Sequence, residues 1–67
     1  MSYEEKIEVI LDNRLEFAKG AEANIQEIEN VKMWLSCEWQ CSDMEMSEFN
    51  RLNQFIDELG KRKFKDL

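Results

Sequence analysis

Two cysteines, Cys37 and Cys41, have the type and spacing best suited to chemistry in this sequence. On a helix, residues four apart lie on one face, so both thiols would point the same way. A structural zinc ion needs four Cys or His ligands, and this chain has no histidine and only these two cysteines. Two chains sharing four thiolates would form a metal-bridged oligomer, and an intersubunit or redox disulfide is a further alternative. The simplest interpretation is two reduced cysteines near a turn, so we predict no metal ion and no cofactor for the single chain.

A second group with chemical potential is an acidic face on one predicted helix, made of Glu5, Glu8, Asp12 and Glu16. Residues 1–48 contain 12 acidic and 4 basic residues, whereas residues 49–67 contain 3 acidic and 5 basic residues. The ordinary interpretation is a solvated helix face. The alternative is a DNA mimic that occupies the phosphate-binding groove of a nucleic-acid-binding protein. Acid–base catalysis would need a concave site between two carboxylates, which two or three helices rarely form, so we predict that the protein is not an enzyme.

Aromatic and methionine residues gather in the middle of the chain. Between Val31 and Trp39, apolar side chains go almost all round the predicted helix instead of following one stripe. A helix segment that is apolar on every side is buried from several directions. Tryptophan often anchors protein interfaces, and methionine adapts to irregular surfaces. These residues either form hydrophobic core or provide a partner-binding surface, for which the candidates are Trp34, Trp39, Met44, Met46 and Phe49.

The elements that carry these groups are predicted to be helices. Good helix formers recur throughout, and no stretch alternates strictly between apolar and polar residues. A capping box of Ser2 and Glu5 begins the first helix. Its apolar stripe keeps one helical phase on both sides of Gly20, which predicts one unbroken helix over about residues 3–37. The glycine would then be tolerated at a cost of about 1 kcal/mol.

A connector over about residues 38–43 and a second helix over about residues 44–59 complete the predicted fold. Either Ser42 with Glu45, or Ser47, would cap the start of this helix. Gly60 stands where a C-terminal glycine cap belongs.

The last predicted segment is a basic tail, residues 60–67, whose cations are Lys61, Arg62, Lys63 and Lys65. Cations at a helix C-terminus interact favourably with the helix dipole. The alternative is contact with phosphate or an anionic membrane, which the net charge of -6 opposes. We therefore expect no direct binding of nucleic acid and no binding to membranes.

The unequal lengths of the two helices predict an oligomer. A helix of about 34 residues is about 50 Å long, and one of about 16 residues is about 24 Å long. A hairpin of the two would leave half of the longer apolar stripe exposed, namely Tyr3, Ile7, Ile10 and Leu11. We predict a single all-α domain, a helical hairpin that dimerises into a four-helix arrangement. The alternative is a monomeric three-helix bundle broken at Gly20.

The overall composition narrows the class of function. The chain has 67 residues, 43% hydrophobic and 36% charged, which is too short for a large enzyme fold and too apolar for a disordered acidic tail. No apolar run exceeds three residues, and the first residues lack a secretory signal pattern, so we expect a cytoplasmic protein. We predict stoichiometric binding to another protein, as a regulator or inhibitor. Phage-encoded antagonists of host machinery offer an analogy in size and charge alone.

Overall fold

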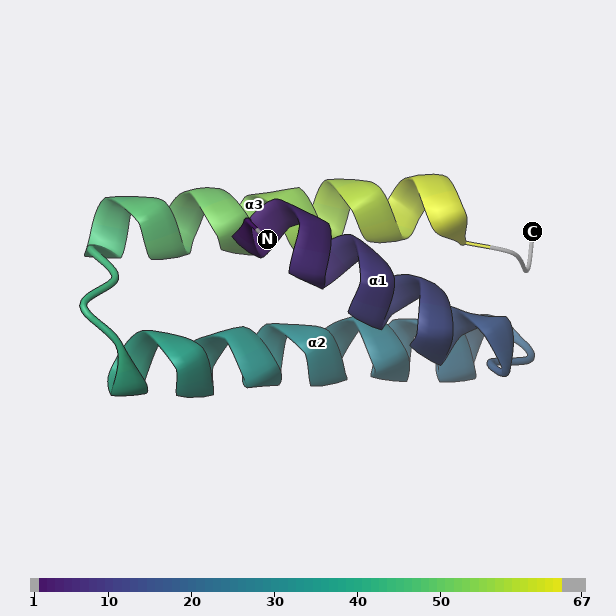
Figure 1. The fold of residues 1–67 in the computed structure, drawn as a ribbon. Coiled ribbons are helices and arrows are strands. Elements are labelled where there is room, and N and C mark those ends of the chain that lie inside the picture. Colours follow the sequence, from purple (N-terminus) through teal and green to yellow (C-terminus); the bar gives the residue numbers. More distant parts are fainter. Residues whose placement is uncertain (1, 65–67) are drawn as a thin grey trace.

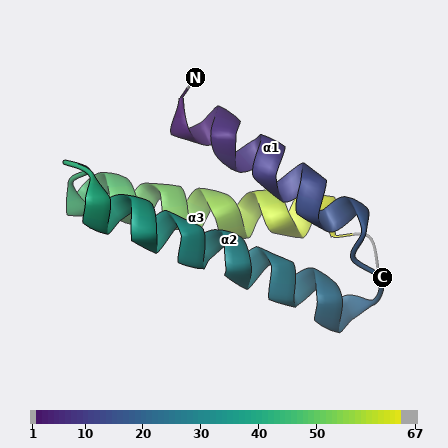
Figure 2. The same cartoon turned by 60° about the horizontal axis from the view of Figure 1, so that its bottom comes forward.

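A computed structural model of the protein describes residues 2–64, which form three α-helices joined by two short turns (Figure 1). The helices are α1 (Tyr3–Glu16), α2 (Ala21–Cys41) and α3 (Met46–Lys63). α2 and α3 form an antiparallel hairpin, and α1 lies on one side of that pair, inclined to it (Figure 2). The all-α prediction is confirmed, and no described helix has the length and apolar character needed to cross a membrane.

The predicted unbroken helix over residues 3–37 is wrong, because the chain reverses at residues 17–20. The backbone N–H of Ala18 donates to the carbonyl of Leu15 at 3.2 Å, closing the end of α1. Gly20 then precedes α2 with φ 89° and ψ 162°. This backbone region is essentially restricted to glycine. The break at Gly20, which was the alternative, is the arrangement that the chain adopts.

The reversal lets the chain bury the apolar stripe of α1 by itself. Ile7 and Leu11 are fully buried, and Leu15 is 1% exposed. They join a core contributed by all three helices, whose other members are Val31, Leu35, Leu52, Ile56 and Leu59. The two-helix hairpin is therefore wrong, and the argument for a dimer loses its basis, because it assumed that Ile7 and Leu11 stay exposed.

The start of α1 confirms the predicted capping box. The Ser2 Oγ accepts a hydrogen bond from the Glu5 backbone N–H at 3.2 Å. In return, the Glu5 carboxylate accepts one from the Ser2 backbone N–H at 3.0 Å. This prediction needed only two residues three positions apart, and their geometry does not depend on the rest of the fold.

The boundaries further along differ from the prediction. α2 continues to Cys41, so the connector is residues 42–45, and α3 ends at Lys63. Neither predicted cap starts α3: its N-cap is Glu45, which makes no side-chain cap hydrogen bond. Gly60 lies buried inside α3 and is not a C-terminal cap.

The basic tail is largely the last turn of α3, which holds Lys61, Arg62 and Lys63. The predicted tail residue Lys65, with residues 66 and 67, lies outside the described residues.

Candidate protein-binding surface

Four of the five residues predicted to bind a partner gather at the turn between α2 and α3. We call this set the hairpin tip and define it as Trp39, Met44, Met46 and Phe49. The Trp39 and Phe49 rings are stacked, with centroids 4.6 Å apart and planes inclined by 17°. Met44 and Phe49 also pack against the core, whereas Met46 is 59% exposed. The tip therefore combines an ordered aromatic pair with an accessible thioether side chain.

The tip lies beyond the reach of α1, which has 14 residues against 21 in α2. The first turn of α1 meets α3 at Arg51, whose guanidinium donates a hydrogen bond to the Glu4 carboxylate. The start of α1 thus lies over the middle of α3, while the turn at residues 42–45 extends past it (Figure 1). With only two helices packed there, Trp39 and Phe49 remain half-buried.

Trp34 belongs with the core more than with the tip. It lies on α2 more than one turn before Trp39, is half-buried and packs against the core cluster. At about 100° per residue from Ile7, Trp34 projects roughly opposite the apolar stripe, which in a two-helix hairpin would leave it uncovered. In a bundle of three helices, α2 has a neighbour on each side, so a wider arc of its surface is covered.

The charges around the tip have one sign. Between Met33 and Asn50 the sequence has no lysine and no arginine, and its four carboxylates there are Glu38, Asp43, Glu45 and Glu48. Glu38 is half-buried, and the other three are exposed. The segment that forms the tip thus carries apolar side chains and carboxylates and no cation.

The predicted acidic face is partly neutralised by α3. The Lys63 Nζ lies 2.6 Å from an Asp12 carboxylate oxygen and 3.8 Å from one of Glu8. The hydrogen bond to Asp12 raises the pKa of Lys63. Hydrogen bonds from the Ser2 backbone N–H and side chain lower the pKa of Glu5. Glu16 is exposed. The face is consequently a mixed surface of ion pairs and a cap, with less free negative charge than the sequence indicates.

Cys37 and Cys41 are both free thiols exposed on the last turns of α2. Within residues 2–64, no three Cys, Asp or Glu side chains converge to hold a metal ion. Over the same part of the chain, no pocket opens in the surface.

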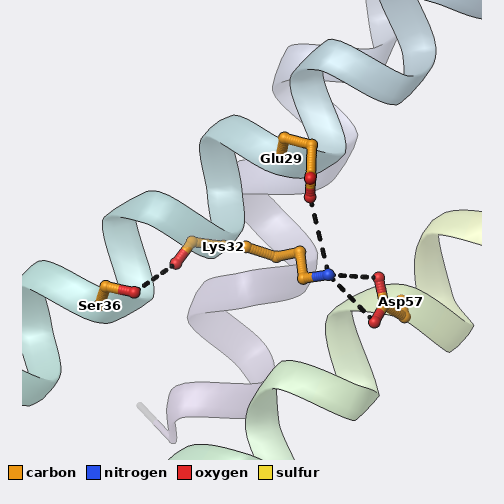
Figure 3. Close-up of polar contacts among 4 residues, drawn as sticks. All are labelled: Glu29, Lys32, Ser36 and Asp57. Carbon is orange, nitrogen blue, oxygen red and sulfur yellow. Dashed lines mark hydrogen bonds and ion pairs between the residues drawn. The ribbon is translucent and has the colours of Figure 1, made fainter.

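Two sets of polar contacts, around Lys32 and at Asn24, were not predicted from the sequence. The Lys32 Nζ lies 2.9 and 3.1 Å from the two Asp57 carboxylate oxygens and 3.6 Å from Glu29 (Figure 3). The hydrogen bond to Asp57 raises the pKa of Lys32. Asn24 is fully buried, and its Nδ2 donates to the Gly20 carbonyl at 2.8 Å. Only the Glu29–Lys32 spacing is visible in the sequence, because the other contacts depend on the break at Gly20 and the pairing of α2 with α3.

Comparison of this chain with protein-family models, with curated proteins and with solved structures found no match.

Proposed function

We propose that the protein is a small non-enzymatic regulator or inhibitor that binds one partner protein through the hairpin tip. The observation that carries this proposal is the half-buried Trp39–Phe49 stack at the end of the hairpin that α1 does not reach. Aromatic side chains that are ordered before binding lose little conformational entropy when a partner covers them. Met46, at 59% exposure, would bury most of its side chain in the same contact.

The charge around the tip specifies the kind of partner. Because the segment between Met33 and Asn50 carries four carboxylates and no cation, the partner should present an apolar patch rimmed by lysine or arginine. Such charges steer the encounter and set specificity, while the apolar contact supplies most of the affinity.

Met46→Glu tests the proposal, because Met46 is exposed and its replacement should leave the fold intact. The wild-type protein, immobilised and exposed to a lysate of its native cell, should retain one partner in a near 1:1 ratio. The Met46→Glu protein should retain less than about a tenth of that amount, because a buried carboxylate is costly. Mass spectrometry and quantitative staining of the retained protein give both results.

Ile25→Glu is the matched control. Ile25 is 54% exposed on α2, and its replacement adds the same charge far from the tip. This variant should retain the partner as the wild type does. Equal retention by the wild type and the Met46→Glu protein, or equal loss from both variants, would contradict binding through the tip.

A homodimer through the same surface is the competing arrangement. Two copies would bring two sets of four carboxylates together, and like charges across an interface oppose association. We therefore propose that the free protein is a monomer. Light scattering should give the chain mass of 8.1 kDa, and twice that mass would support the dimer instead.

DNA mimicry remains a second proposal, supported by the concentration of acidic residues in residues 1–48. It would use Glu5, Glu8, Asp12 and Glu16, of which Glu8 and Asp12 share Lys63 as a counter-charge. Salt separates the two proposals: binding through a row of exposed charges weakens steeply as ionic strength rises. Binding through the hairpin tip should weaken much less over the same rise in ionic strength, because the apolar contact supplies most of its affinity.

A further inference from the structure

Two exposed thiols stand on either side of an aromatic residue of the hairpin tip. Cys37 and Cys41 are exposed free thiols at the end of α2, and Trp39 lies between them in the sequence. The Trp39 ring stacks on Phe49 of α3 with the centroids 4.6 Å apart. The backbone that joins the two cysteines is thus the same backbone that positions Trp39 for this stack. A change of its conformation moves an aromatic ring of the tip.

An intact helix holds the two cysteines just outside disulfide geometry. Four residues advance about 6 Å along a helix, and disulfides join Cα atoms about 4.4–6.8 Å apart. The Cβ atoms of such residues are about 5–6 Å apart, however, whereas a disulfide needs about 3.5–4.5 Å. Because α2 is helical through Cys41, the bond between Cys37 and Cys41 closes only if the last turn of α2 leaves the helical conformation.

The end of α2 is the part of this helix that opens at least cost. The buried residues of α2 end at Leu35, so none of residues 38–41 is buried. The last turn contains no lysine or arginine, and Glu38 places a carboxylate near the negative end of the helix dipole. Ser42 is already extended, with φ -131° and ψ 176°. A helix terminus with few buried contacts opens locally without unfolding the rest of the bundle.

We propose that a small-molecule disulfide such as oxidised glutathione converts Cys37 and Cys41 to one internal disulfide, which unwinds the last turn of α2 and disrupts the hairpin tip. One cysteine thiolate attacks a sulfur of the oxidant, forms a mixed disulfide and releases the first small thiol. The other cysteine thiolate then attacks the protein sulfur of that mixed disulfide and releases the second small thiol. Two electrons pass from the protein to the oxidant, and the two cysteine protons end on the two released thiols.

This inference rests on the proposed function, because it makes partner binding depend on the oxidation state of the chain. The reduced protein presents the ordered aromatic pair, and the oxidised protein does not. The internal disulfide and the Trp39–Phe49 stack exclude each other, so the two are coupled in both directions. A substitution that weakens the stack must therefore favour the disulfide, even when it lies on the other helix.

The first test needs only the purified protein, equilibrated with mixtures of reduced and oxidised glutathione and analysed by mass spectrometry after alkylation of the remaining thiols. The oxidised chain should contain one internal disulfide, stay monomeric and lose near-ultraviolet circular dichroism from its aromatic pair. Phe49→Leu should shift the equilibrium towards the disulfide by about 2- to 12-fold, the range expected for an aromatic pair. Phe55→Leu, the same substitution at another partly buried position of α3, should leave the equilibrium unchanged.

Four outcomes of this first test would overturn the inference. They are failure to form the internal bond, disulfide-linked dimers in its place, an oxidised chain with undiminished circular dichroism, and equal shifts in the two phenylalanine variants.

The second test connects the disulfide with binding. The immobilised protein is oxidised, washed free of glutathione and exposed to a desalted lysate of its native cell. The oxidised wild type should retain less than about a tenth of the partner that the reduced wild type retains, because loss of an anchoring residue weakens an interface about tenfold or more. Cys37→Ser, which lacks one of the two thiols, should retain the partner equally before and after the same treatment.

The two proposals fail in different ways. Equal retention by the reduced and the oxidised wild type would overturn the redox control and leave binding through the tip in place. A reduced wild type that retains no partner would contradict the proposed function, while the first test still decides whether the internal disulfide breaks the stack.

Discussion

Gly20 is the residue that separates two possible folds of this chain. Its φ of 89° and ψ of 162° reverse the direction of the backbone, and the Asn24 side chain holds the Gly20 carbonyl from inside the next helix. Apart from its two chain neighbours, no residue has an atom within 4 Å of the place where a Cβ would be added. Glycine is therefore required at position 20 because of its backbone conformation, and not because a side chain would clash with a neighbour.

Gly20→Ala should destabilise the bundle by about 1–3 kcal/mol, the usual cost of placing a side chain in a glycine-only region. Urea unfolding followed by circular dichroism measures the change. Lys19→Ala, at the exposed neighbouring position, is the control and should change stability by less than about 0.5 kcal/mol. A Gly20→Ala protein that is more stable and dimeric would show that the chain prefers the unbroken helix.

The break at Gly20 was not predicted, because the angular position of apolar residues around a helix axis can be the same before and after a turn. After the turn, α2 must direct apolar side chains to the same core as α1, and its phase is free to coincide with that of α1. Phe17 and Ile25 have the helical phase of that apolar stripe, yet Phe17 is 80% exposed and Ile25 is 54% exposed. The Ser2–Glu5 capping box was predicted correctly because it is local. The pair Lys19–Gly20 is also a local pattern, typical of a helix C-terminus, but the prediction gave more weight to the periodic stripe.

At the scale of elements, Gly60 allows α2 and α3 to approach closely. A Cβ at Gly60 would lie 2.8 Å from the Ile28 Cδ1 and 2.9 Å from its Cγ1. The sequence alone suggested a C-terminal helix cap at Gly60. A glycine that follows an apolar stripe looks the same in the sequence whether it ends the helix or lies within it against a neighbouring helix. Only the pairing of α3 with α2 shows that the glycine serves packing.

Gly60→Ala should be destabilising by roughly 1 kcal/mol, because overpacking of about 1–3 kcal/mol exceeds a gain in helix propensity of at most about 1 kcal/mol. In an Ile28→Ala background the contact disappears, and the same change should become neutral or stabilising. The double-mutant cycle should therefore give a coupling of at least about 1 kcal/mol in urea unfolding. Ser47→Ala, at an exposed position of α3, shows the effect of propensity alone. Additive effects in the cycle would contradict the close packing.

The hairpin tip is also a feature of elements, since it exists because α1 is shorter than α2. Of the aromatic and methionine residues that the sequence grouped together, Trp39 and Phe49 stack on each other, Met44 lies in the turn between their helices, and Met46 begins α3. The sequence did not show which of them face solvent. That division depends on where α1 begins along α3, and the contact of Glu4 with Arg51 fixes that position.

For the whole molecule, every pair of helices is linked by an ion pair on its outer edge. Arg14 meets Glu27 between α1 and α2, and Lys32 meets Asp57 between α2 and α3. Glu4–Arg51 and Asp12–Lys63 link α1 with α3. In three of these pairs the two residues are 13, 25 and 47 positions apart in the sequence. Residue spacing in the sequence therefore cannot predict these ion pairs. Each exposed pair contributes little alone, but together they favour one register of the three helices.

These pairs predict how the stability of the molecule depends on pH. The hydrogen bond from Arg51 lowers the pKa of Glu4 from its ordinary 4.5, and the Ser2 hydrogen bonds do the same for Glu5. A lowered carboxyl pKa gives stability that is present above the unfolded value and lost as pH falls through the folded value. Hydrogen bonds to Asp57 and Asp12 raise the pKa of Lys32 and Lys63 above 10.5, respectively. Their contribution is complete below 10.5 and is lost as pH rises through the folded values.

Thermal unfolding between about pH 3 and pH 11 should therefore show a plateau from about pH 5.5 to about 9.5, since the sequence has no histidine and the lysine contribution is complete below 10.5, with losses on both sides. Arg51→Gln isolates one contribution, because it removes the hydrogen bond that lowers the pKa of Glu4. This variant should melt below the wild type at pH 7, and the difference should shrink as pH falls below 4.5, where Glu4 becomes protonated in both proteins. Lys61→Gln, which removes a charge from the exposed side of the same helix, should give a difference that changes much less over this range. A constant difference for Arg51→Gln down to pH 3 would mean that the Glu4–Arg51 pair does not hold α1 on α3 in solution.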